Sequence, residues 1–250
     1  MPEPYDRFAP HFDAWQQSFG GAYDTLILPR ILGALASHRP PVRSVVDLGS
    51  GTGDLVIALA RAGYTVLAID RSAAMLDVAR AKISGADLAT APTLLEQDLR
   101  TFRLARPVEA AICVYTVINQ LTDHSDLARA MAAVHAALVP GGLFLFEVNL
   151  LAAYERYWRG VERVTLPDAV LTREHHAVEG GRIVEASVTI CRGDGTAVHD
   201  RIAQRVYDDD EIEAALAGAG FACHGVARYD PFDPAGAPVK ALWSAQRVRT

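Results

Sequence analysis

The chain has 250 residues, of which 50% are hydrophobic and 22% are charged, and its formal net charge is −6. This size allows one domain with an insertion or two small domains. The acidic balance lacks the excess of Lys and Arg that tracks a phosphate backbone, so we expect no nucleic-acid partner. No apolar run is long enough to span a bilayer and no signal-peptide pattern opens the chain, so we expect no membrane association and a cytoplasmic location.

Cysteine usage supports the same location. Cys113, Cys191 and Cys223 lie far apart in apolar, strand-like segments. An odd, scattered set matches neither a disulfide framework nor a zinc site. We therefore expect three buried, reduced thiols.

The first 38 residues have a helical pattern with aromatic side chains mostly three or four positions apart. Such a stripe packs against a core or covers a pocket, and the pattern alone allows both interpretations. Its members are Tyr5, Phe8, Phe12, Trp15, Phe19 and Tyr23.

Residues 42–150 alternate strand and helix patterns at the spacing of βαβ units. The expected strands are 43–48, 64–69, 92–96, 109–115 and 143–148, and the expected helices are 54–62, 73–83 and 126–138. The stretch Val139-Pro140-Gly141-Gly142 should end the last helix. Short connections and right-handed crossovers predict an α/β fold with a doubly wound parallel sheet.

Residues 160–207 differ, because apolar and polar side chains alternate over 170–176, 182–191 and 197–207. Turn-forming stretches at 179–181 and 192–195 separate these segments. We expect an antiparallel sheet inserted into the α/β core. A helix over 208–220 and strands over 221–228 and 240–247 then complete a seven-stranded, mostly parallel sheet.

The most informative segment follows the first strand and reads Asp47-Leu48-Gly49-Ser50-Gly51-Thr52-Gly53-Asp54. Glycines accept positive φ and let a ligand approach the backbone, at a place where α/β sheets bind small molecules. A dinucleotide fingerprint would need its third glycine at position 54, which is Asp. The spacing therefore disfavours a nicotinamide-dependent oxidoreductase, whereas the Asp47 carboxylate suits a ligand with a cationic amine. A glycine-rich turn without a ligand is the alternative.

With Asp-x-Gly-x-Gly-x-Gly at 47–53, the chain resembles the class I S-adenosylmethionine (SAM) dependent methyltransferases. Asp70 after the second strand, Asp98-Leu99 after the third and the Val-Pro-Gly-Gly stretch match the same pattern. The resemblance implies SAM as cofactor, with Asp70 accepting hydrogen bonds from both ribose hydroxyls and Asp98 near the adenine. The implied cofactor-binding set is Asp47, Gly49, Ser50, Gly51, Gly53, Asp70, Arg71, Met75, Asp98, Leu99, Tyr115, Tyr5 and Tyr23.

Ordinary structural roles compete with some of these assignments. Asp70 can cap the helix that follows it, and acids such as Asp98 are common in loops. Met75 suits an adenine-stacking surface or a helix core equally well.

A finer resemblance rests on Tyr5-Asp6-Arg7-Phe8-Ala9, Ile118-Asn119-Gln120-Leu121 and Phe146-Glu147-Val148-Asn149. These segments are similar to small-molecule methyltransferases with a helical N-terminal lid and an inserted β-sheet cap. The resemblance implies a SAM-binding core over 1–159 and 208–250, a lid over 1–40 and a substrate cap over 160–207. It makes Tyr115, Thr116 and Asn119 candidate pocket residues. Trp243, with Tyr229, Asp230 and Asp233, would line a polar pocket mouth, or these residues belong to a solvated loop.

The expected reaction is methyl transfer to an amine or a hydroxyl of a small molecule. The sulfonium methyl is already electrophilic, so alignment is the main task and we expect no dedicated base. The candidates for a base are His176, His199 and Tyr229. His175 and His176 should face opposite sides of a strand, and we expect no metal. The alternative is a non-catalytic SAM-binding regulatory or assembly protein. Both a monomer and a homodimer are compatible with the sequence.

Overall fold

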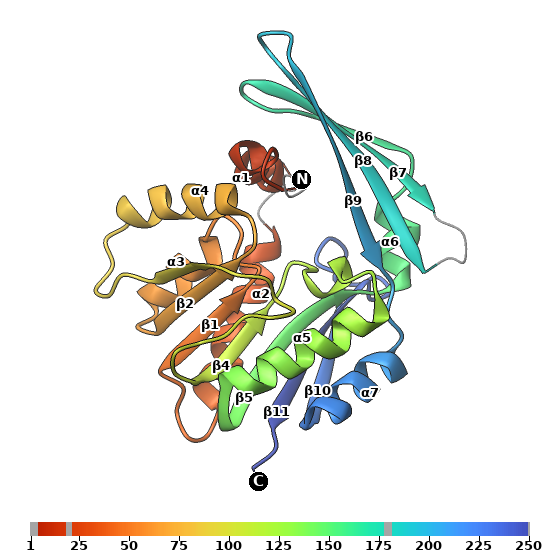
Figure 1. The fold of residues 1–250 in the computed structure, drawn as a ribbon. Helices are drawn as coiled ribbons and strands as arrows, with labels where there is room; N and C mark the ends of the chain where they lie inside the picture. The colour runs from red at the N-terminus through yellow and green to blue at the C-terminus, as the bar shows by residue number, and fades with distance from the viewer. Residues whose placement is uncertain (1–4, 19–21, 178–181, 250) are drawn as a thin grey trace.

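The computed structural model describes residues 5–18, 22–177 and 182–249, without the side chains of residues 22–25 and 177. Two helices, α1 (Ala9–Gln17) and α2 (Ala22–Ser37), precede an α/β core. In Figure 1 the core forms the lower part of the molecule, and a second, smaller sheet rises above it with α1 lying between the two.

The core sheet contains β1 (Ser44–Leu48), β2 (Thr65–Asp70), β3 (Thr93–Glu96), β4 (Val108–Cys113), β5 (Leu138–Asn149), β10 (Phe221–Tyr229) and β11 (Lys240–Arg247). Its strand order is β10-β11-β5-β4-β1-β2-β3. Strand β11 runs antiparallel to both of its neighbours, and the other pairings are parallel. The predicted seven-stranded, mostly parallel sheet is confirmed.

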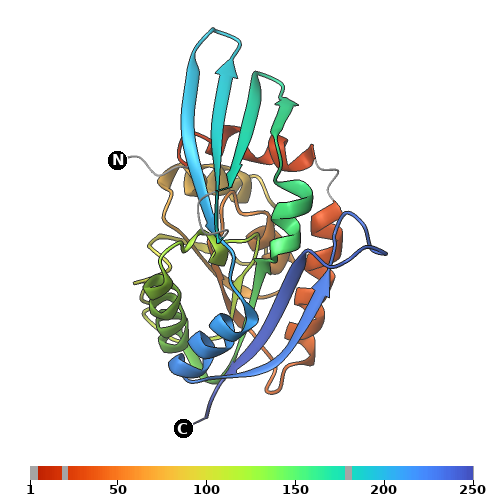
Figure 2. The same cartoon turned by 90° about the vertical axis from the view of Figure 1, so that its right-hand side faces the viewer.

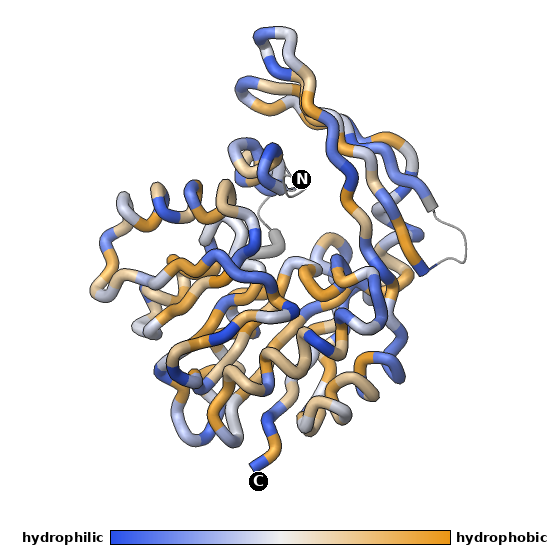
Figure 3. Tube along the Cα trace, in the orientation of Figure 1, coloured by the Kyte–Doolittle hydropathy of each residue, from blue (hydrophilic) through white to orange (hydrophobic). Residues whose placement is uncertain are grey.

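Local signals in the sequence place the helices that flank this sheet, α3 (Asp54–Arg61), α4 (Ala73–Ser84), α5 (His124–Ala137) and α7 (Asp209–Ala219). The Ser72 hydroxyl caps α4 by accepting the Met75 N–H at 3.1 Å, and Asp208 with Glu211 forms a capping box at α7. Apolar side chains of α5 and α7 cover one face of the sheet, and those of α2 and α3 cover the other. Figure 3 shows the hydrophobic strands between these layers.

The insertion between β5 and α7 contains α6 (Leu151–Tyr157) and a separate antiparallel sheet. That sheet has the order β6 (Val161–Thr165), β7 (Ala169–Ala177), β8 (Ile183–Arg192) and β9 (Ala197–Arg205). Figure 2 shows it projecting beyond the core. Its inner face packs Leu171, Val188 and Ile202 against Phe8 near α1, so the insertion and the N-terminal helix share a small core.

Several expectations need correction. Helix α6 and strand β6 were not expected from the sequence. Strand β5 begins at Leu138, so Val139–Gly142 lies inside a strand with a register shift nearby. Cys113 is buried as expected, but Cys191 and Cys223 are exposed. The expected turn at 179–181 lies outside the described residues. Within the described ranges, no helix is long and apolar enough to cross a membrane.

Candidate active site

A cavity of about 860 Å³ lies between the core and the inserted sheet. Its floor comes from the loops after β1, β2, β3 and β4, which meet at the carboxyl edge of the sheet. Its roof comes from α1 and from the inner face of β7, β8 and β9. Apolar and aromatic side chains predominate in the upper half, and carboxylates gather on the floor.

The three glycines in the turn between β1 and α3 differ in the space around their Cα atoms. Gly49, Gly51 and Gly53 have φ values of 71°, 52° and 86°. A Cβ on Gly49 would lie 2.5 Å from Val117 Cγ2, and one on Gly53 would lie 2.9 Å from Ala79 Cβ. A Cβ on Gly51 would meet no atom within 4 Å, because this residue faces the cavity. Gly51 alone of the three therefore keeps space for a ligand.

Asp70 ends β2 and is fixed by backbone groups on both sides. Its Oδ2 accepts the Gly51 N–H at 2.8 Å, and its Oδ1 accepts the Ser72 N–H at 2.9 Å. Burial raises the pKa of Asp70, and the two N–H donors partly oppose this shift. Each oxygen retains a lone pair, and the side chain lines the cavity. The cap of α4 is Ser72, which leaves Asp70 available for a ligand.

Asp47 lies below the glycine turn and is 2% exposed. Burial, with a contribution from the Asp70 charge, raises the pKa of Asp47 to about 7. It borders a small hollow with Ser50 and Gly51, and the buried Ser50 hydroxyl has no hydrogen-bond partner among the described residues. No ion pair to Asp47 occurs in the described part of the chain. A cationic, hydrogen-bonding ligand group suits this hollow.

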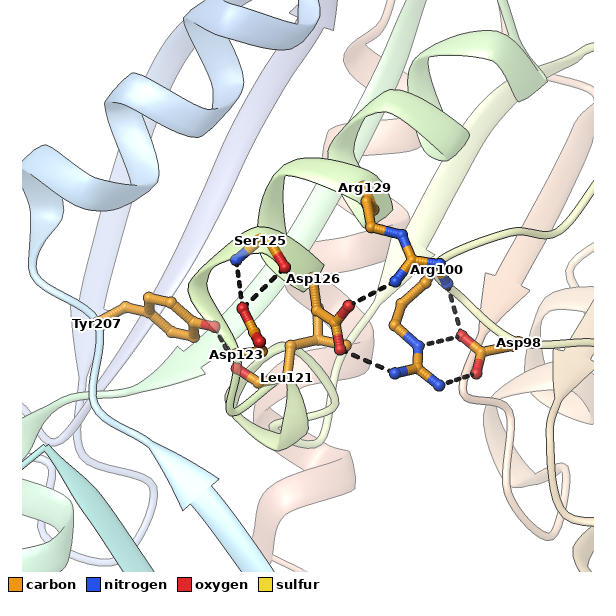
Figure 4. A network of polar contacts seen from close by, with 8 residues as sticks. All are labelled: Asp98, Arg100, Leu121, Asp123, Ser125, Asp126, Arg129 and Tyr207. Carbon is orange, nitrogen blue, oxygen red and sulfur yellow. Dashed lines mark hydrogen bonds and ion pairs between the residues drawn. The ribbon is translucent and has the colours of Figure 1, made fainter.

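Asp98 lines the cavity after β3 and belongs to a polar network (Figure 4). Its Oδ1 accepts the backbone N–H and the Nε–H of Arg100, both at 2.8 Å, and Arg100 Nη1 lies 2.8 Å from Asp126 Oδ2. The Arg100 guanidinium lowers the pKa of Asp98. Leu99 and Met75 line the same region while largely buried, so Met75 belongs to the helix core and also borders the cavity. Arg71 also lines the cavity.

The turn after β4 is strained at Tyr115 and Thr116, which have φ values of 60° and 63°. This left-handed conformation costs about 1–2 kcal/mol for each residue other than Gly. Gln204 of β9 holds the turn, because its Nε2 donates to Thr116 Oγ1 at 3.2 Å while its Oε1 accepts the Tyr154 hydroxyl at 2.8 Å. Strain of this kind persists where the surroundings enforce it, and it concentrates at functional sites.

Helix α1 is tied to the core by two carboxylates. The Ser72 hydroxyl donates to Asp6 at 2.6 Å, and Lys82 Nζ lies 2.8 Å from Asp13, which also accepts the Thr52 hydroxyl. Tyr5 lines the cavity and accepts a 3.2 Å hydrogen bond from Gln120. Burial raises the pKa of Tyr5 to about 12. The described part of the aromatic stripe packs against the inserted sheet and lines the cavity with Tyr5, Phe8, Phe12 and Trp15. Phe19 and the side chain of Tyr23 lie outside the described residues.

Several expected site residues lie elsewhere. Asn119 and Trp243 are completely buried away from the cavity, so their expected substrate contacts are corrected. Asn119 Nδ2 donates to the carbonyls of Asn149 and Arg205, and Trp243 stacks on Phe146 with ring centroids 6.0 Å apart. Gly53 packs against α4 and does not line the cavity. Asn119 was expected at the pocket because of the resemblance of the loop after the fourth strand, and such a resemblance does not reveal which side chains of the loop point into the core.

The three candidate bases also lie outside the cavity lining. His176 contacts Ser187 at 3.2 Å and His199 contacts Thr189 at 3.0 Å, on the outer face of the inserted sheet. Tyr229 donates its hydroxyl proton to the buried Glu147. None of the three candidates therefore lies where it could act as a base on a ligand in this cavity. His175 does face the opposite side from His176 and packs on Trp158, and no metal-binding cluster occurs within the described residues.

The insertion lines the cavity with residues that the sequence pattern did not identify, among them Trp158, Glu162, Arg173 and Gln204. Strand alternation puts Arg173 and Glu162 on the face that carries Leu171. The pattern does not reveal which face of an isolated sheet is covered, however, because polar side chains occur on both faces here.

Comparison with known proteins agrees with this geometry. Residues 45–142 match the model of a methyltransferase domain. A putative methyltransferase of Bacillus subtilis is 24% identical over 94% of this chain and 98% of its own length. A SAM-dependent methyltransferase from Clostridium acetobutylicum superposes with a TM-score of 0.76, at 19% identity over 94% of this chain and 99% of that one. An amino pentose methyltransferase from Micromonospora echinaspora, solved with bound SAM, has a TM-score of 0.71, at 23% identity over 95% and 96% of the two chains.

The fold and the glycine turn define a Rossmann-like methyltransferase domain. Residues 45–142 thus correspond to a methyltransferase domain, and the chain as a whole has the fold of solved SAM-dependent methyltransferases.

Proposed function

We propose that the enzyme transfers the methyl group of SAM to an amine nitrogen of a small molecule. The carrying observation is the cavity that runs from the glycine turn to the inner face of the inserted sheet, where aromatic side chains of the N-terminal segment and of α6 also line it. Its volume suits a donor together with a compact acceptor. Relatives at 25–26% identity are named as N,N-dimethyltransferases of amino sugars, from Streptomyces fradiae and Streptomyces venezuelae, which favours nitrogen over oxygen as the acceptor atom.

The floor of the cavity supplies the contacts that the donor requires. Asp70 would accept hydrogen bonds from the ribose hydroxyls, since each oxygen has a lone pair beyond the one used by the backbone. Asp47 and the Ser50 hydroxyl would receive the ammonium of the methionine part. Asp98, Leu99 and Met75 would surround the adenine. The open side of Gly51 supports this assignment, because a side chain at that position would occupy the same space.

The chain's own residues contribute alignment and exclusion of water. Bound SAM supplies a methyl group that is already activated by the sulfonium. The strained Tyr115–Thr116 turn and Tyr5 border the space between donor and acceptor. Because its pKa is about 12, Tyr5 keeps its proton at neutral pH and acts as a hydrogen-bonding group. We propose that the amine reacts as the free base, so that positioning supplies most of the rate.

The insertion and the N-terminal segment would have different roles in binding. Residues 160–207 form the acceptor side of the cavity, and the N-terminal segment 1–40 covers the donor. Contacts of α1 with both parts support this division, because Trp15 packs on Arg173 of β7 while Asp13 contacts Lys82 of α4.

A titration of the purified protein with SAM and with S-adenosylhomocysteine tests the donor assignment. Incubation with isotope-labelled SAM and a panel of primary amines, each paired with the corresponding alcohol, then tests methyl transfer. We expect micromolar binding of both nucleosides and labelled products from amines. Tight donor binding without any labelled product would instead support the non-catalytic SAM-binding alternative.

A further inference from the structure

Arg173 of β7 is a nearly buried cation in the roof of the cavity. Its side chain is 10% exposed, and it lines the cavity opposite the donor floor. The guanidinium carbon lies 5.1 Å from the ring centre of Trp15 and 4.8 Å from that of Trp158. Attraction between a cation and an aromatic face stabilises this position and leaves the edge of the guanidinium for hydrogen bonding.

Glu162 occupies only part of that edge. It lies directly opposite Arg173 in the β6–β7 register. Its Oε2 accepts from Arg173 Nε at 2.9 Å and lies 2.7 Å from Nη2. A guanidinium has five N–H donors, so three have no acceptor among the described residues. The Arg173 side chain is only 10% exposed and lines the cavity, so these donors open toward the cavity, where a bound group can accept hydrogen bonds from them.

The remaining edge faces the same space as the donor-side residues. Burial dominates the raised pKa of Tyr5, and the positive charge of Arg173 opposes that rise. The hydrophobic side chains Leu171 and Val188 flank Arg173 in the roof. Flanked by these side chains, a fork of N–H donors favours a planar or tetrahedral group of negatively charged oxygens.

We propose that the free edge of Arg173 binds an oxyanion, a carboxylate or a phosphate, carried by the methyl acceptor. This inference rests on the proposed function for its role in the reaction. Glu162 holds the guanidinium in place and offsets its charge, and the two tryptophans fix its plane. The site therefore selects an acceptor that carries an amine at one end and an anionic group at the other.

The test uses the full-length protein, with and without S-adenosylhomocysteine, titrated with benzoate, phenyl phosphate and benzamide. These probes share one ring, and benzamide lacks the charge. We expect at least one anion to bind the wild type about tenfold more tightly than benzamide, because a charge-assisted pair in a shielded site is stronger than a neutral one. The stronger of the two anions distinguishes a carboxylate from a phosphate.

Two substitutions should act in opposite directions. Arg173→Gln should remove the preference for the anion, whereas Glu162→Gln should strengthen anion binding several-fold because it leaves the cation without its countercharge. A purely structural ion pair would instead lose binding of all three probes in both variants. Arg163→Gln is the matched control, since Arg163 is the exposed neighbour of Glu162 on β6. It should change neither anion nor amide binding.

Equal binding of the three probes by the wild type would overturn the inference, as would an anion preference that survives in Arg173→Gln. Equal binding by the wild type overturns the inference even where a variant fails to fold. The wild-type comparison is also separate from the proposed function: absence of nucleoside binding would refute the donor assignment, whereas the anion preference is measured independently in the donor-free protein.

Discussion

The backbone N–H of Gly51 donates a 2.8 Å hydrogen bond to the Asp70 carboxylate and so joins the glycine turn to the end of the neighbouring strand. Gly51 has open space above it, and Asp70 is proposed to bind the ribose. The hydrogen bond therefore holds the two residues together as one rigid unit. Each of them positions the other before a ligand arrives, which lowers the ordering cost of binding.

Replacement of Asp70 should weaken donor binding without unfolding the protein. Asp70→Ala removes two acceptor oxygens from the cavity, and we expect SAM affinity to fall by about 1–3 kcal/mol, the usual loss for a charge-assisted hydrogen bond. Calorimetric titration measures it. Asp77→Asn, on the exposed side of α4, is the control. If Asp70→Ala weakened binding of a 2′,3′-dideoxy analogue as much as it weakened binding of SAM, the ribose hydroxyls would not be the partners of Asp70.

A methyl group on Gly51 should block the donor directly. Gly51→Ala and Gly63→Ala carry similar backbone costs, because both glycines have positive φ, 52° and 91°, and neither Cβ would meet an atom within 4 Å. Gly51 faces the cavity, whereas Gly63 lies in an exposed turn after α3. We expect Gly51→Ala alone to lose binding of S-adenosylhomocysteine. Identical affinities for the two folded variants would contradict the placement of the donor.

The buried Asp47 should make the free protein less stable as the pH rises. Burial raises its pKa from 3.8 in the unfolded chain to about 7 in the fold. The folded state therefore binds more protons between these values, and the stability present below pH 4 is lost as the pH rises through about 7. Asp47→Asn should remove this loss and raise the Tm of the donor-free protein at pH 8 by at least about 3 °C.

The same substitution should weaken SAM binding, since a neutral amide cannot pair with the ammonium. Thermal scans at pH 5 and pH 8, with and without SAM, separate the two effects. A variant whose Tm gain is the same at both pH values would show that Asp47 remains charged throughout.

The contacts of Asp13 should slow release of the donor. Asp13 of α1 contacts both Thr52 in the glycine turn and Lys82 of α4. Asp13→Ala removes both, and we expect S-adenosylhomocysteine to dissociate several-fold faster in stopped-flow measurements. Glu155→Gln, an exposed change on α6, should leave the rate unaltered. An unchanged rate in Asp13→Ala would show that α1 does not retain the nucleoside.

Asn119 should affect stability rather than binding. Its side chain accepts the Asn149 N–H at 2.9 Å and donates to two carbonyls, all in a fully buried position. Asn119→Ala leaves these groups unpaired, so the free energy of unfolding should fall by roughly 2–4 kcal/mol. Urea titration measures the fall, and the SAM affinity of the folded fraction should stay within about twofold of wild type.

The sequence predicted the floor of the cavity because that floor depends on local pattern. An acid and a glycine turn after a buried strand predict a pocket wherever the strand ends, and Gly51 and Asp70 lie there. The acceptor side depends on which face of the insertion is covered. Arg173 and His176 occupy one strand, and only the packing of α1 decides that the first faces the cavity and the second faces outward.

The sequence also did not show that two of the candidate pocket residues are buried in the core. Asn119 and Trp243 have side chains that suit a pocket, yet both complete the interior of the core. Their neighbours in the fold come from distant segments, Arg205 for Asn119 and Phe146 for Trp243. Alternation within one strand or turn does not encode such long-range contacts.

The insertion leaves the core after β5 and returns before α7, and Asn119 bonds the carbonyls of Asn149 and Arg205 at these two ends. The Asn119 side chain thus holds the first and the last residues of the insertion against the α/β core. Because both ends of the insertion meet at one fixed junction, the segment could be exchanged between homologous enzymes by recombination at these two points. Such an exchange would replace the proposed acceptor side of the cavity and leave the glycine turn and the Asp70 strand unchanged.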